Sequence, residues 1–392
     1  MKKLLVLGAG YANLAFLKNL DSKFFRDFQV TLISKESYHY TSVLLHEVAA
    51  GENKRICYNL NEILPFCVQV IKDEVCEICE GYVIGKKEQY DYDYLVVGLG
   101  FSSDSFGIKG VEEYAIPLVD FNGAIKIRES LSRQFDRYQN GDKDALRIAV
   151  CGAGFSGIEL VASLCETLKK EANFRNIPQK EIQLISIEAM SKIIPMFPDE
   201  LIEKATRKLK ESQVDFALEC KILEIKENAI VVERNGKQDE IPVGLSIWTA
   251  GVKGNSVIQN SQFFVSSRSR VEVNEYLQPI GQTYQNAMKN IYVIGDCAVL
   301  KDPISGRFYP PTAQISIQEG VYLARAFQNR VYGGRIAKFT YHSKGTVCSL
   351  GSSDAIGLVG DKKISGKSAI FLKRLIEKKW MYYLFGLRGL FK

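Results

Sequence analysis

The apolar residues of this chain include two short runs that end in closely similar glycine turns. "KKLLVL" leads into "GAGYANLA" from Gly8, and "LRIAVC" leads into "GAGFSGIE" from Gly152. An apolar pattern of helical period follows each turn. The pattern therefore predicts a strand, a glycine turn and a helix, twice in one chain.

Glycine turns in this context are typical of dinucleotide sites. The first glycine permits a tight turn, and the second lets the backbone approach a pyrophosphate at the positive end of the helix. The second copy has all three glycines, Gly152, Gly154 and Gly157, whereas the first has Asn13 in the third place. We expect the helix–strand packing there to accommodate a side chain. Two such turns predict two dinucleotides, a flavin and a nicotinamide.

Further apolar runs extend each copy into a whole βαβ unit. "FQVTLIS" (28–34) and "YDYLVVGLG" (92–100) continue the first copy, while "IQLISIE" (182–188) and "GLSIWTAG" (244–251) continue the second. "NIYVIGDCA" (290–298) predicts a strand that returns to the first unit. The predicted fold class is α/β, with two Rossmann-like dinucleotide-binding domains and a C-terminal membrane-associating segment.

The domain boundaries follow from this order of elements. We expect residues 1–120 and 285–345 to form a discontinuous FAD-binding domain and residues 121–284 to form the NADH-binding domain. Residues 346–392 should form a C-terminal interface and membrane-anchoring region, in which "TVCSLGSSDAIGLV" (346–359) predicts sheet.

Composition excludes several classes of protein. The 392 residues are 46% hydrophobic and 24% charged, an ordinary globular balance. The net charge of +6 is concentrated in residues 367–392, which hold seven Lys or Arg against Glu377 alone, so no nucleic-acid-binding stripe is expected. Nine scattered cysteines predict free thiols in a reducing compartment. Three histidines offer no metal cluster, and no uncharged run is long enough to span a membrane.

Two acidic residues stand where dinucleotide domains need them. Glu188 ends the second strand of the second unit, where a carboxylate bonds ribose hydroxyls and repels a 2′-phosphate, which favours NADH over NADPH. A surface glutamate at a strand end is the alternative. In the first unit the same place holds Ser34 and Lys35. Asp296 follows a strand and a glycine, a position from which a carboxylate can bond the ribityl hydroxyls of a flavin.

In type and order these motifs resemble the two-dinucleotide-binding flavoproteins, and more narrowly the type II NADH:quinone oxidoreductases. The narrower resemblance rests on "GFSGIELVASL", "WTAGV", "IGDCA", "PPTAQISIQEG" and "GTVCSLGS". It implies an FAD-dependent enzyme that passes electrons from NADH, its substrate, to a membrane quinone of the menaquinone or ubiquinone type without pumping protons. It also implies a homodimer at the cytoplasmic face of the cell membrane, bound peripherally.

The resemblance also implies the site residues. Glu159, Gln314 and Gln318 are expected to be catalytic, the two glutamines at the quinone because residues i and i+4 share a helix face. The alternatives without a catalytic role are that Glu159 is an acid stabilised at a helix N-terminus and that the two glutamines lie on a solvent-exposed helix face. The expected FAD contacts are Gly8, Ala9, Gly10, Tyr11, Ala12, Ser34, Lys35, Val75, Asp296, Ala313, Gln314 and Lys373. The expected NADH contacts are Gly152, Gly154, Gly157, Glu159, Glu188 and Gly251.

The cysteines leave other functions open. Cys76 and Cys79 form a C-x-x-C pair that could serve a disulfide reductase, although the surrounding acids favour a structural or incidental role. Cys297 and Cys348 could serve a sulfide:quinone reductase. A flavin- and NADH-binding sensor with low turnover is the third alternative.

The C-terminal segment combines apolar and basic residues at helical spacing. Its apolar positions are Phe371, Leu372, Leu375, Ile376, Tyr383, Leu384, Leu387, Leu390 and Phe391, with Trp380, Tyr382 and Tyr383 as aromatics. This pattern predicts a helix that lies in a bilayer surface. A core-packing or dimer-forming helix is the alternative.

Overall fold

The computed structural model describes residues 1–281 and 287–391. The chain forms two compact units, and each is described by itself. The first unit comprises residues 1–40, 57–102 and 252–343, and the second comprises residues 41–56, 103–251 and 344–392.

The first unit is built on a five-stranded parallel sheet in the order β21-β9-β1-β2-β5. Its strands are β1 (Lys2–Leu7), β2 (Phe28–Ser34), β5 (Val68–Lys72), β9 (Tyr94–Val97) and β21 (Ile291–Val293). The pairing of β21 with β9 confirms that the chain returns to the first sheet late in the sequence. Because the strands are parallel, their carboxyl ends lie at one edge, where dinucleotide sites form.

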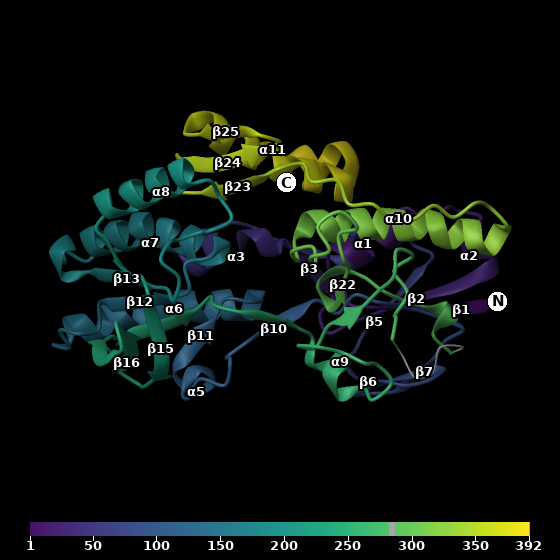
Figure 1. The fold of residues 1–392 in the computed structure, drawn as a ribbon, viewed down its shortest axis with the longest axis horizontal. Helices are drawn as coiled ribbons and strands as arrows, with labels where there is room; N and C mark the ends of the chain where they lie inside the picture. Colours follow the sequence, from purple (N-terminus) through teal and green to yellow (C-terminus); the bar gives the residue numbers. More distant parts are fainter. Residues whose placement is uncertain (282–286, 392) are drawn as a thin grey trace. The chain divides into compact units, whose positions relative to one another are not determined.

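Helices α1 (Tyr11–Lys18) and α10 (Ala313–Tyr332) lie side by side in this unit (Figure 1). Their contact requires a glycine, because a Cβ on Gly320 would lie 2.1 Å from the carbonyl oxygen of Ala12. The remaining elements are small: α2 (Phe24–Asp27), β3 (Tyr38–Tyr40), β4 (Cys57–Asn59), α4 (Leu60–Ile63), β6 (Val75–Ile78), β7 (Tyr82–Gly85), β8 (Gln89–Asp91), β10 (Phe101–Ser103, which runs to the unit boundary), β19 (Val252–Gly254), α9 (Ser256–Asn260), β20 (Val271–Glu272) and β22 (Ala298–Val299).

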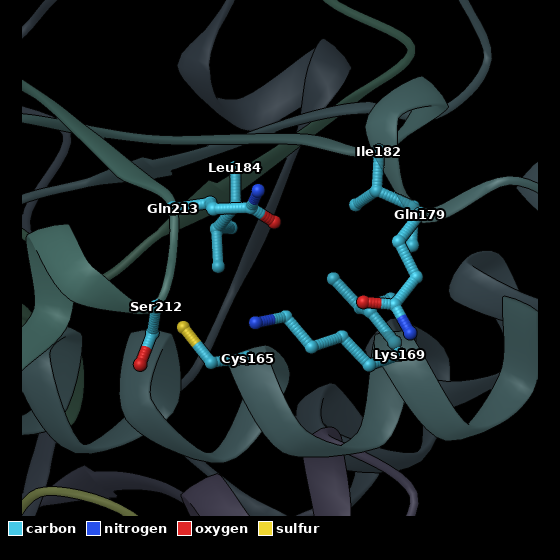
Figure 2. Close-up of a pocket in the computed structure, with 8 residues that line it drawn as sticks. Cys165, Lys169, Gln179, Ile182, Leu184, Ser212 and Gln213 are labelled. Atoms are coloured by element: carbon cyan, nitrogen blue, oxygen red, sulfur yellow. The ribbon is translucent and has the colours of Figure 1, made fainter.

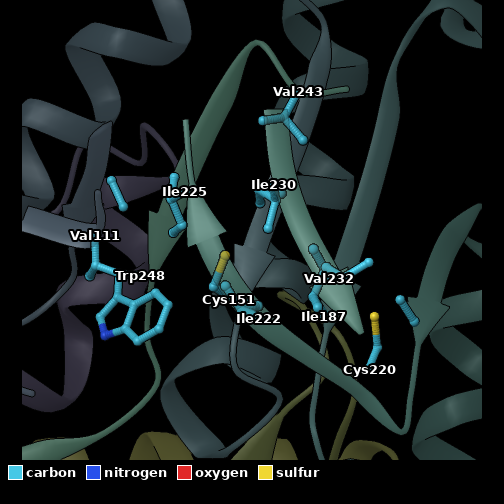
Figure 3. Packing of buried hydrophobic residues seen from close by; sticks show 13 residues of the cluster. Val111, Cys151, Ile187, Cys220, Ile222, Ile225, Ile230, Val232, Val243 and Trp248 are labelled. Atoms are coloured by element: carbon cyan, nitrogen blue, oxygen red, sulfur yellow. The ribbon is translucent and has the colours of Figure 1, made fainter. Parts of the chain in front are cut away.

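The second unit repeats the plan with a parallel sheet in the order β11-β18-β12-β13-β14. Its strands are β11 (Ala115–Pro117), β12 (Arg147–Cys151), β13 (Gln183–Ile187), β14 (Val214–Ala217) and β18 (Leu245–Trp248). An antiparallel sheet of β15 (Cys220–Ile225), β16 (Ala229–Arg234) and β17 (Lys237–Pro242) accompanies it. Figure 3 shows the core of this unit, in which Trp248 and Cys151 of the parallel sheet are buried with Ile222 and Ile230 of the antiparallel one.

The helices of the second unit are α3 (Leu45–Ala49), α5 (Val111–Tyr114), α6 (Phe121–Gln139), α7 (Phe155–Phe174), α8 (Asp199–Glu211) and α11 (Lys367–Phe385). The C-terminal strands β23 (Thr346–Ser349), β24 (Ala355–Val359) and β25 (Lys362–Ser365) form an antiparallel sheet, as the sequence predicted for this stretch. This sheet lies against α7 and α8, and α11 packs on it (Figure 1). None of the helices in the described part of the chain is both long and apolar enough to cross a bilayer.

The unit boundaries differ from the expected domain boundaries. The chain changes unit after residue 102 rather than after residue 120, because β11 pairs with β18 in the second sheet. The expected boundary between 284 and 285 lies outside the described residues, and residues 252–281 already belong to the first unit. Residues 346–392 do not stand apart, since α11 and its sheet pack within the second unit.

Candidate active site

The first glycine turn joins β1 to α1 and leaves an open cradle. Gly8 has φ +93°, and a Cβ there would lie 2.5 Å from the carbonyl oxygen of Gly98, so only glycine fits. Gly10 begins the helix without a side-chain cap, and a Cβ on it would meet no atom within 4 Å. The helix N-terminus with its unsatisfied N–H groups therefore faces free space, which suits a pyrophosphate.

Asn13 fulfils the expectation that this turn accommodates a side chain. Asn13 is fully buried, and its Nδ2 donates to the carbonyl oxygens of Leu7 and Gly8, each at 2.7 Å. The Asn13 side chain thus connects the end of β1 to the start of α1. In a turn with a third glycine, close packing of that glycine would make this connection.

His39 also contacts this turn, although no sequence pattern singled it out. Its Nδ1 lies 3.0 Å from the carbonyl oxygen of Ala9, and its ring meets the Tyr11 ring edge-on with centroids 5.2 Å apart. Burial lowers the pKa of His39 to about 4, so the ring is neutral at physiological pH.

The other residues predicted to contact the dinucleotide of the first unit differ in their burial. Ser34 is buried at the end of β2, and Val75 is buried at the start of β6. Lys35 is exposed, and its ammonium lies 3.8 Å from Glu74. Lys35 is therefore held by a surface acid.

Asp296 presents a buried oxygen without a protein partner. Its Oδ1 has no hydrogen bond to any described residue, and burial raises the pKa of its carboxyl although Arg270 opposes this. Nε and Nη2 of Arg270 are likewise buried and unpaired within the described residues. Buried polar atoms are rarely left unpaired, so these orphans fit a ligand rich in hydroxyl and phosphate groups, as FAD is.

Glu319 supports the turn that carries Asp296. Its Oε2 accepts a hydrogen bond of 2.6 Å from the Gly295 N–H. Burial raises the pKa of Glu319 to about 8, which makes it a second buried acid that sequence reasoning missed.

The two glutamines of α10 share one helix face, but Gln318 is already engaged. Gln318 Nε2 donates to the His342 carbonyl oxygen at 3.0 Å, and the His342 N–H donates to Gln318 Oε1 at 3.1 Å. Gln314 is half-buried one turn earlier, next to Ala313 at the helix start. Gln318 therefore fixes the segment at residue 342 and has one further N–H to offer a ligand.

The second glycine turn joins β12 to α7 and is more tightly packed. A Cβ on Gly152 (φ +107°) would lie 2.8 Å from the Ala250 nitrogen, and one on Gly157 would lie 2.0 Å from the Gly152 carbonyl oxygen. A Cβ on Gly154 would meet nothing within 4 Å, so space is open at the helix start. Gly251, expected at the nicotinamide, has φ +70° and no room for a Cβ beside Phe106.

Glu188 lies at this turn, as predicted. Its Oε2 accepts a hydrogen bond of 2.7 Å from the Ala153 N–H, and its Oε1 accepts one of 3.0 Å from the Met190 N–H. The carboxylate is thereby fixed beside the residue between the first two glycines, where it can meet a ribose.

Glu159 and Lys373 form a buried ion pair that the sequence did not predict, although it singled out both residues. The Lys373 ammonium donates to Glu159 Oε1 and, at 2.9 Å, to Ser349 Oγ. The Ser349 N–H and hydroxyl donate to the same Glu159 oxygen at 2.9 and 3.0 Å. Burial alone would raise the pKa of Glu159, but Lys373 and His46 outweigh it, so that the pKa is lowered. Glu159 correspondingly raises the pKa of Lys373 against the effect of burial, so both groups are charged.

His46 of α3 faces the other oxygen of Glu159. Its Nδ1 lies 3.6 Å from Glu159 Oε2, and its Nε2 lies 3.9 Å from Glu47 Oε1. Burial lowers the pKa of His46 to about 4. Glu47 is paired with Lys54 at 2.6 Å, and Lys54 with Glu377 at 3.1 Å. A connected set of ionisable groups thus runs from the surface to Glu159.

A separate pocket in the second unit is too small to be a cofactor site. It is lined by Cys165 and Lys169 of α7, Ile182 and Leu184, and Ser212 and Gln213 (Figure 2). Its volume of about 20 Å³ holds about one water molecule.

Comparison with known proteins decides the family. The family model described as pyridine nucleotide-disulphide oxidoreductase matches residues 2–320. A type II NADH:quinone oxidoreductase from Staphylococcus epidermidis is 36% identical over 406 residues, and one from Staphylococcus haemolyticus is 34% identical over 406 residues. Each alignment covers 100% of this chain and 98% of the relative. The chain is a type II NADH:quinone oxidoreductase.

Solved structures agree on the fold. NDH2 from Plasmodium falciparum in complex with NADH superposes with a TM-score of 0.89 at 19% identity, covering 100% of this chain and 96% of that one. The sulfide:quinone oxidoreductase of Aquifex aeolicus gives 0.79 at 20% identity, covering 99% and 92%. Since the fold alone is shared at such identities, the roles of residues in this type II oxidoreductase rest on its own geometry.

The neutral state of His46 predicts how the second unit responds to acid. The pKa of His46 is about 4 in the folded state and 6.5 in the unfolded state. Between these pH values the unfolded chain therefore carries a proton on His46 that the folded chain does not. Stability should therefore fall as pH decreases from 6.5 to about 4. Urea unfolding can be followed by tryptophan fluorescence, which reports only this unit because Trp248 and Trp380 both lie in it. His46→Gln should lose part of this acid dependence, and an unchanged dependence would show that His46 is protonated in the folded state.

Proposed function

We propose that this chain oxidises NADH and reduces a membrane quinone, with FAD bound in the first unit and NADH in the second. Family membership supports the overall reaction. The observation that carries the two sites is that each parallel sheet ends in its own glycine turn with open space at a helix start. When bound, FAD supplies the redox chemistry, which links the two-electron oxidation of NADH to the reduction of the quinone.

The first unit holds the FAD through its glycine turn and Asp296. The N–H groups at the start of α1 face the pyrophosphate, and the unpaired Oδ1 of Asp296 accepts from a ribityl hydroxyl. The neutral His39 fixes the turn through Ala9 without adding charge. The assigned FAD contacts are Gly8, Ala9, Gly10, Tyr11, Ala12, Ser34, Val75, Asp296, Ala313 and Gln314, with Lys35 as a further candidate.

The second unit holds the NADH through its glycine turn and Glu188. The carboxylate of Glu188 accepts from the adenosine ribose hydroxyls, for which it is already oriented by two backbone N–H groups. Glu159 lies in α7 just past its first turn, where it is buried, ionised and able to take a proton.

The quinone is assigned to the face of α10 that carries Gln314 and Gln318. A neutral amide can donate to a quinone carbonyl oxygen without introducing charge. Gln314 is the more direct donor, because Gln318 gives its carbonyl oxygen and one N–H to His342.

The buried thiols argue against sulfide chemistry at Cys297 and Cys348. Cys297 and Cys348 are buried, and burial raises the pKa of Cys297 to about 12 and that of Cys348 well above its usual value. The thiolate is the reactive form, so neither residue is activated.

Anaerobic absorption spectra test this function directly. Purified protein should show an FAD spectrum, NADH should bleach it, and a soluble quinone analogue should restore it. Bleaching without recovery would instead support the sensor alternative, and a protein that purifies without flavin in any preparation would contradict the proposal.

The position of Glu188 predicts a strong preference for NADH over NADPH. A 2′-phosphate beside this carboxylate costs about 1.4–2.7 kcal/mol or more, which is roughly 10- to 100-fold or more in kcat/KM. Glu188→Gln should narrow the preference by lowering the NADPH penalty, as measured by steady-state kinetics with both nucleotides. Glu219→Gln, an exposed change in the same unit, should leave the preference as it is. Equal efficiency of the unmodified protein with both nucleotides would refute the assignment.

The helix α11 has a buried and an exposed apolar face. Ala369, Lys373, Trp380, Met381 and Leu384 are buried in the second unit. The expectation that Trp380 and Leu384 belong to a membrane-facing stripe is therefore wrong, because they pack inward. Phe371, Leu375 and Ile376 are 68%, 54% and 52% exposed. With Tyr382, Leu387, Leu390 and Phe391, which are also exposed, they form what we call the outer stripe.

The outer stripe and the basic residues around it form a surface suited to an anionic bilayer, and we assign it as the peripheral membrane contact on the cytoplasmic side. Basic residues near such a surface contribute ~1 kcal/mol each, and apolar burial adds to this. A second copy of the chain is the alternative occupant of the stripe.

Substitutions on the outer stripe should release the protein from vesicles. Truncation would also remove the buried Trp380, so Leu375→Gln with Ile376→Gln is the sharper change. Flotation with anionic vesicles should fall several-fold, while Phe174→Gln, at a position 83% exposed on α7, should float like the unmodified protein. Full flotation of the stripe variant, together with loss of a dimer in size-exclusion chromatography, would assign the stripe to dimer formation.

A further inference from the structure

The proposed reaction consumes a proton that the protein must supply. Oxidation of NADH by a quinone balances as NADH + H⁺ + Q → NAD⁺ + QH₂. The hydride accounts for two electrons and one hydrogen of the quinol, so a second hydrogen comes from water as a proton in each turnover. This inference rests on the proposed function, because only that reaction needs the proton.

Glu159 has little direct access to water. The residue is 8% exposed, and its Oε1 is occupied by Lys373 and by two hydrogen bonds from Ser349. Its Oε2 faces Nδ1 of His46 at 3.6 Å. Within the described part of the chain, His46 is thus the titratable group that can deliver a proton to this oxygen.

The opposite side of the His46 ring faces a second carboxyl group. Nε2 lies 3.9 Å from Glu47 Oε1, and Glu47 Oε2 lies 2.6 Å from the Lys54 ammonium. The Lys54 side chain is 36% exposed, so this end of the chain of groups meets solvent. Burial raises the pKa of Glu47, although its ion pair with Lys54 opposes this shift.

We propose that His46 is a relay residue that conducts the proton from Glu47 to Glu159. Protonated Glu47 gives a proton to Nε2, the Nδ1 proton passes to Glu159 Oε2, and Glu47 takes a new proton from water. After the transfer His46 carries its proton on Nε2, and a 180° rotation of the ring or a transfer in the reverse direction returns the proton to the Nδ1 side. Both gaps are longer than a hydrogen bond, so transfer occurs when the side chains close them, as is common for unliganded sites.

The groups around His46 are balanced for this role. Glu159 on α7 attracts a proton to the ring, as does a hydrogen bond with the Val43 backbone, whereas Lys373 on α11 and Lys54 repel it. Glu47 on α3 places a second carboxyl group 3.9 Å from the ring. Cys348 on β23 is neutral, and Glu377 is paired with Lys54. Burial keeps the resting ring uncharged, so it can accept a proton on one nitrogen and release one from the other.

Matched variants of the holoenzyme separate this role from a structural one. Glu47→Gln removes the donor, and His46→Gln removes the relay. Glu203→Gln is the control, because Glu203 is an exposed carboxyl group on α8 of the same unit and is not among the groups that act on His46 or Glu47. Stopped-flow measurements follow the flavin absorbance and, with an indicator dye in weak buffer, the uptake of the proton.

Both relay variants should let NADH bleach the flavin within about twofold of the normal rate, while quinone reduction and proton uptake slow at least about tenfold. The rate in His46→Gln should also fall as pH rises from 6 to 8, because protons then arrive only from bulk solution. Glu203→Gln should behave as the unmodified protein. Normal quinone reduction in His46→Gln, or equal slowing of both half-reactions, would overturn the relay.

A second readout needs no turnover. With ¹⁵N-labelled histidine, the ring N–H of His46 should exchange with water more slowly in Glu47→Gln than in the unmodified protein or in Glu203→Gln. Equal exchange in all three would overturn the path through Glu47. If neither the unmodified protein nor Glu203→Gln reduced any quinone, the proposed function itself would fail, and this outcome does not depend on His46.

Discussion

The buried ion pair between Lys373 and Glu159 is the interaction on which the site of the second unit depends. Two charges removed from water cost several kcal/mol each, and such a pair is tolerated only when its geometry and remaining hydrogen bonds are good. Ser349 provides them by donating twice to Glu159 and accepting from Lys373. Three segments distant in sequence, α7, β23 and α11, are thereby held at one point. The pair also determines the charge state of its neighbours, since an ionised Glu159 is what gives the neutral His46 a proton acceptor.

The two glycine turns reach the same geometry by different means. In the second unit Gly157 packs against the Gly152 carbonyl, whereas in the first unit the Asn13 amide bonds the carbonyls of Leu7 and Gly8. Each turn then has one further polar residue that fixes it, Glu188 in the second and His39 in the first. The carboxylate suits a ligand that presents ribose hydroxyls, while the neutral imidazole adds no charge beside a pyrophosphate. These differences fit an assignment of NADH to one turn and FAD to the other.

Much of the fold could be read from local pattern. Strand, glycine turn and helix are consecutive in sequence, so the two parallel sheets and the positions of Glu188 and Asp296 followed from spacing. The contribution of residues 41–56 to the second unit could not, because nothing local tells α3 to pack on α6 and α7 rather than on its neighbours in the chain. His46 was missed for the same reason. In α11, apolar residues occur on most of the helix surface, so composition did not reveal that Trp380 and Leu384 face inward while Phe371 and Leu375 face outward.

A double-mutant cycle on Lys373 and Glu159 tests most directly whether this pair organises the site. Lys373→Met, Glu159→Gln and the double variant can each be unfolded in urea at pH 7, with the fluorescence of Trp248 and Trp380 reporting the second unit. Each single change should lower the free energy of unfolding by ~3–5 kcal/mol, because it leaves one buried charge or polar group unpaired. The double variant should lose clearly less than the sum of the two. Losses that simply add would contradict a coupled ion pair at the centre of this unit.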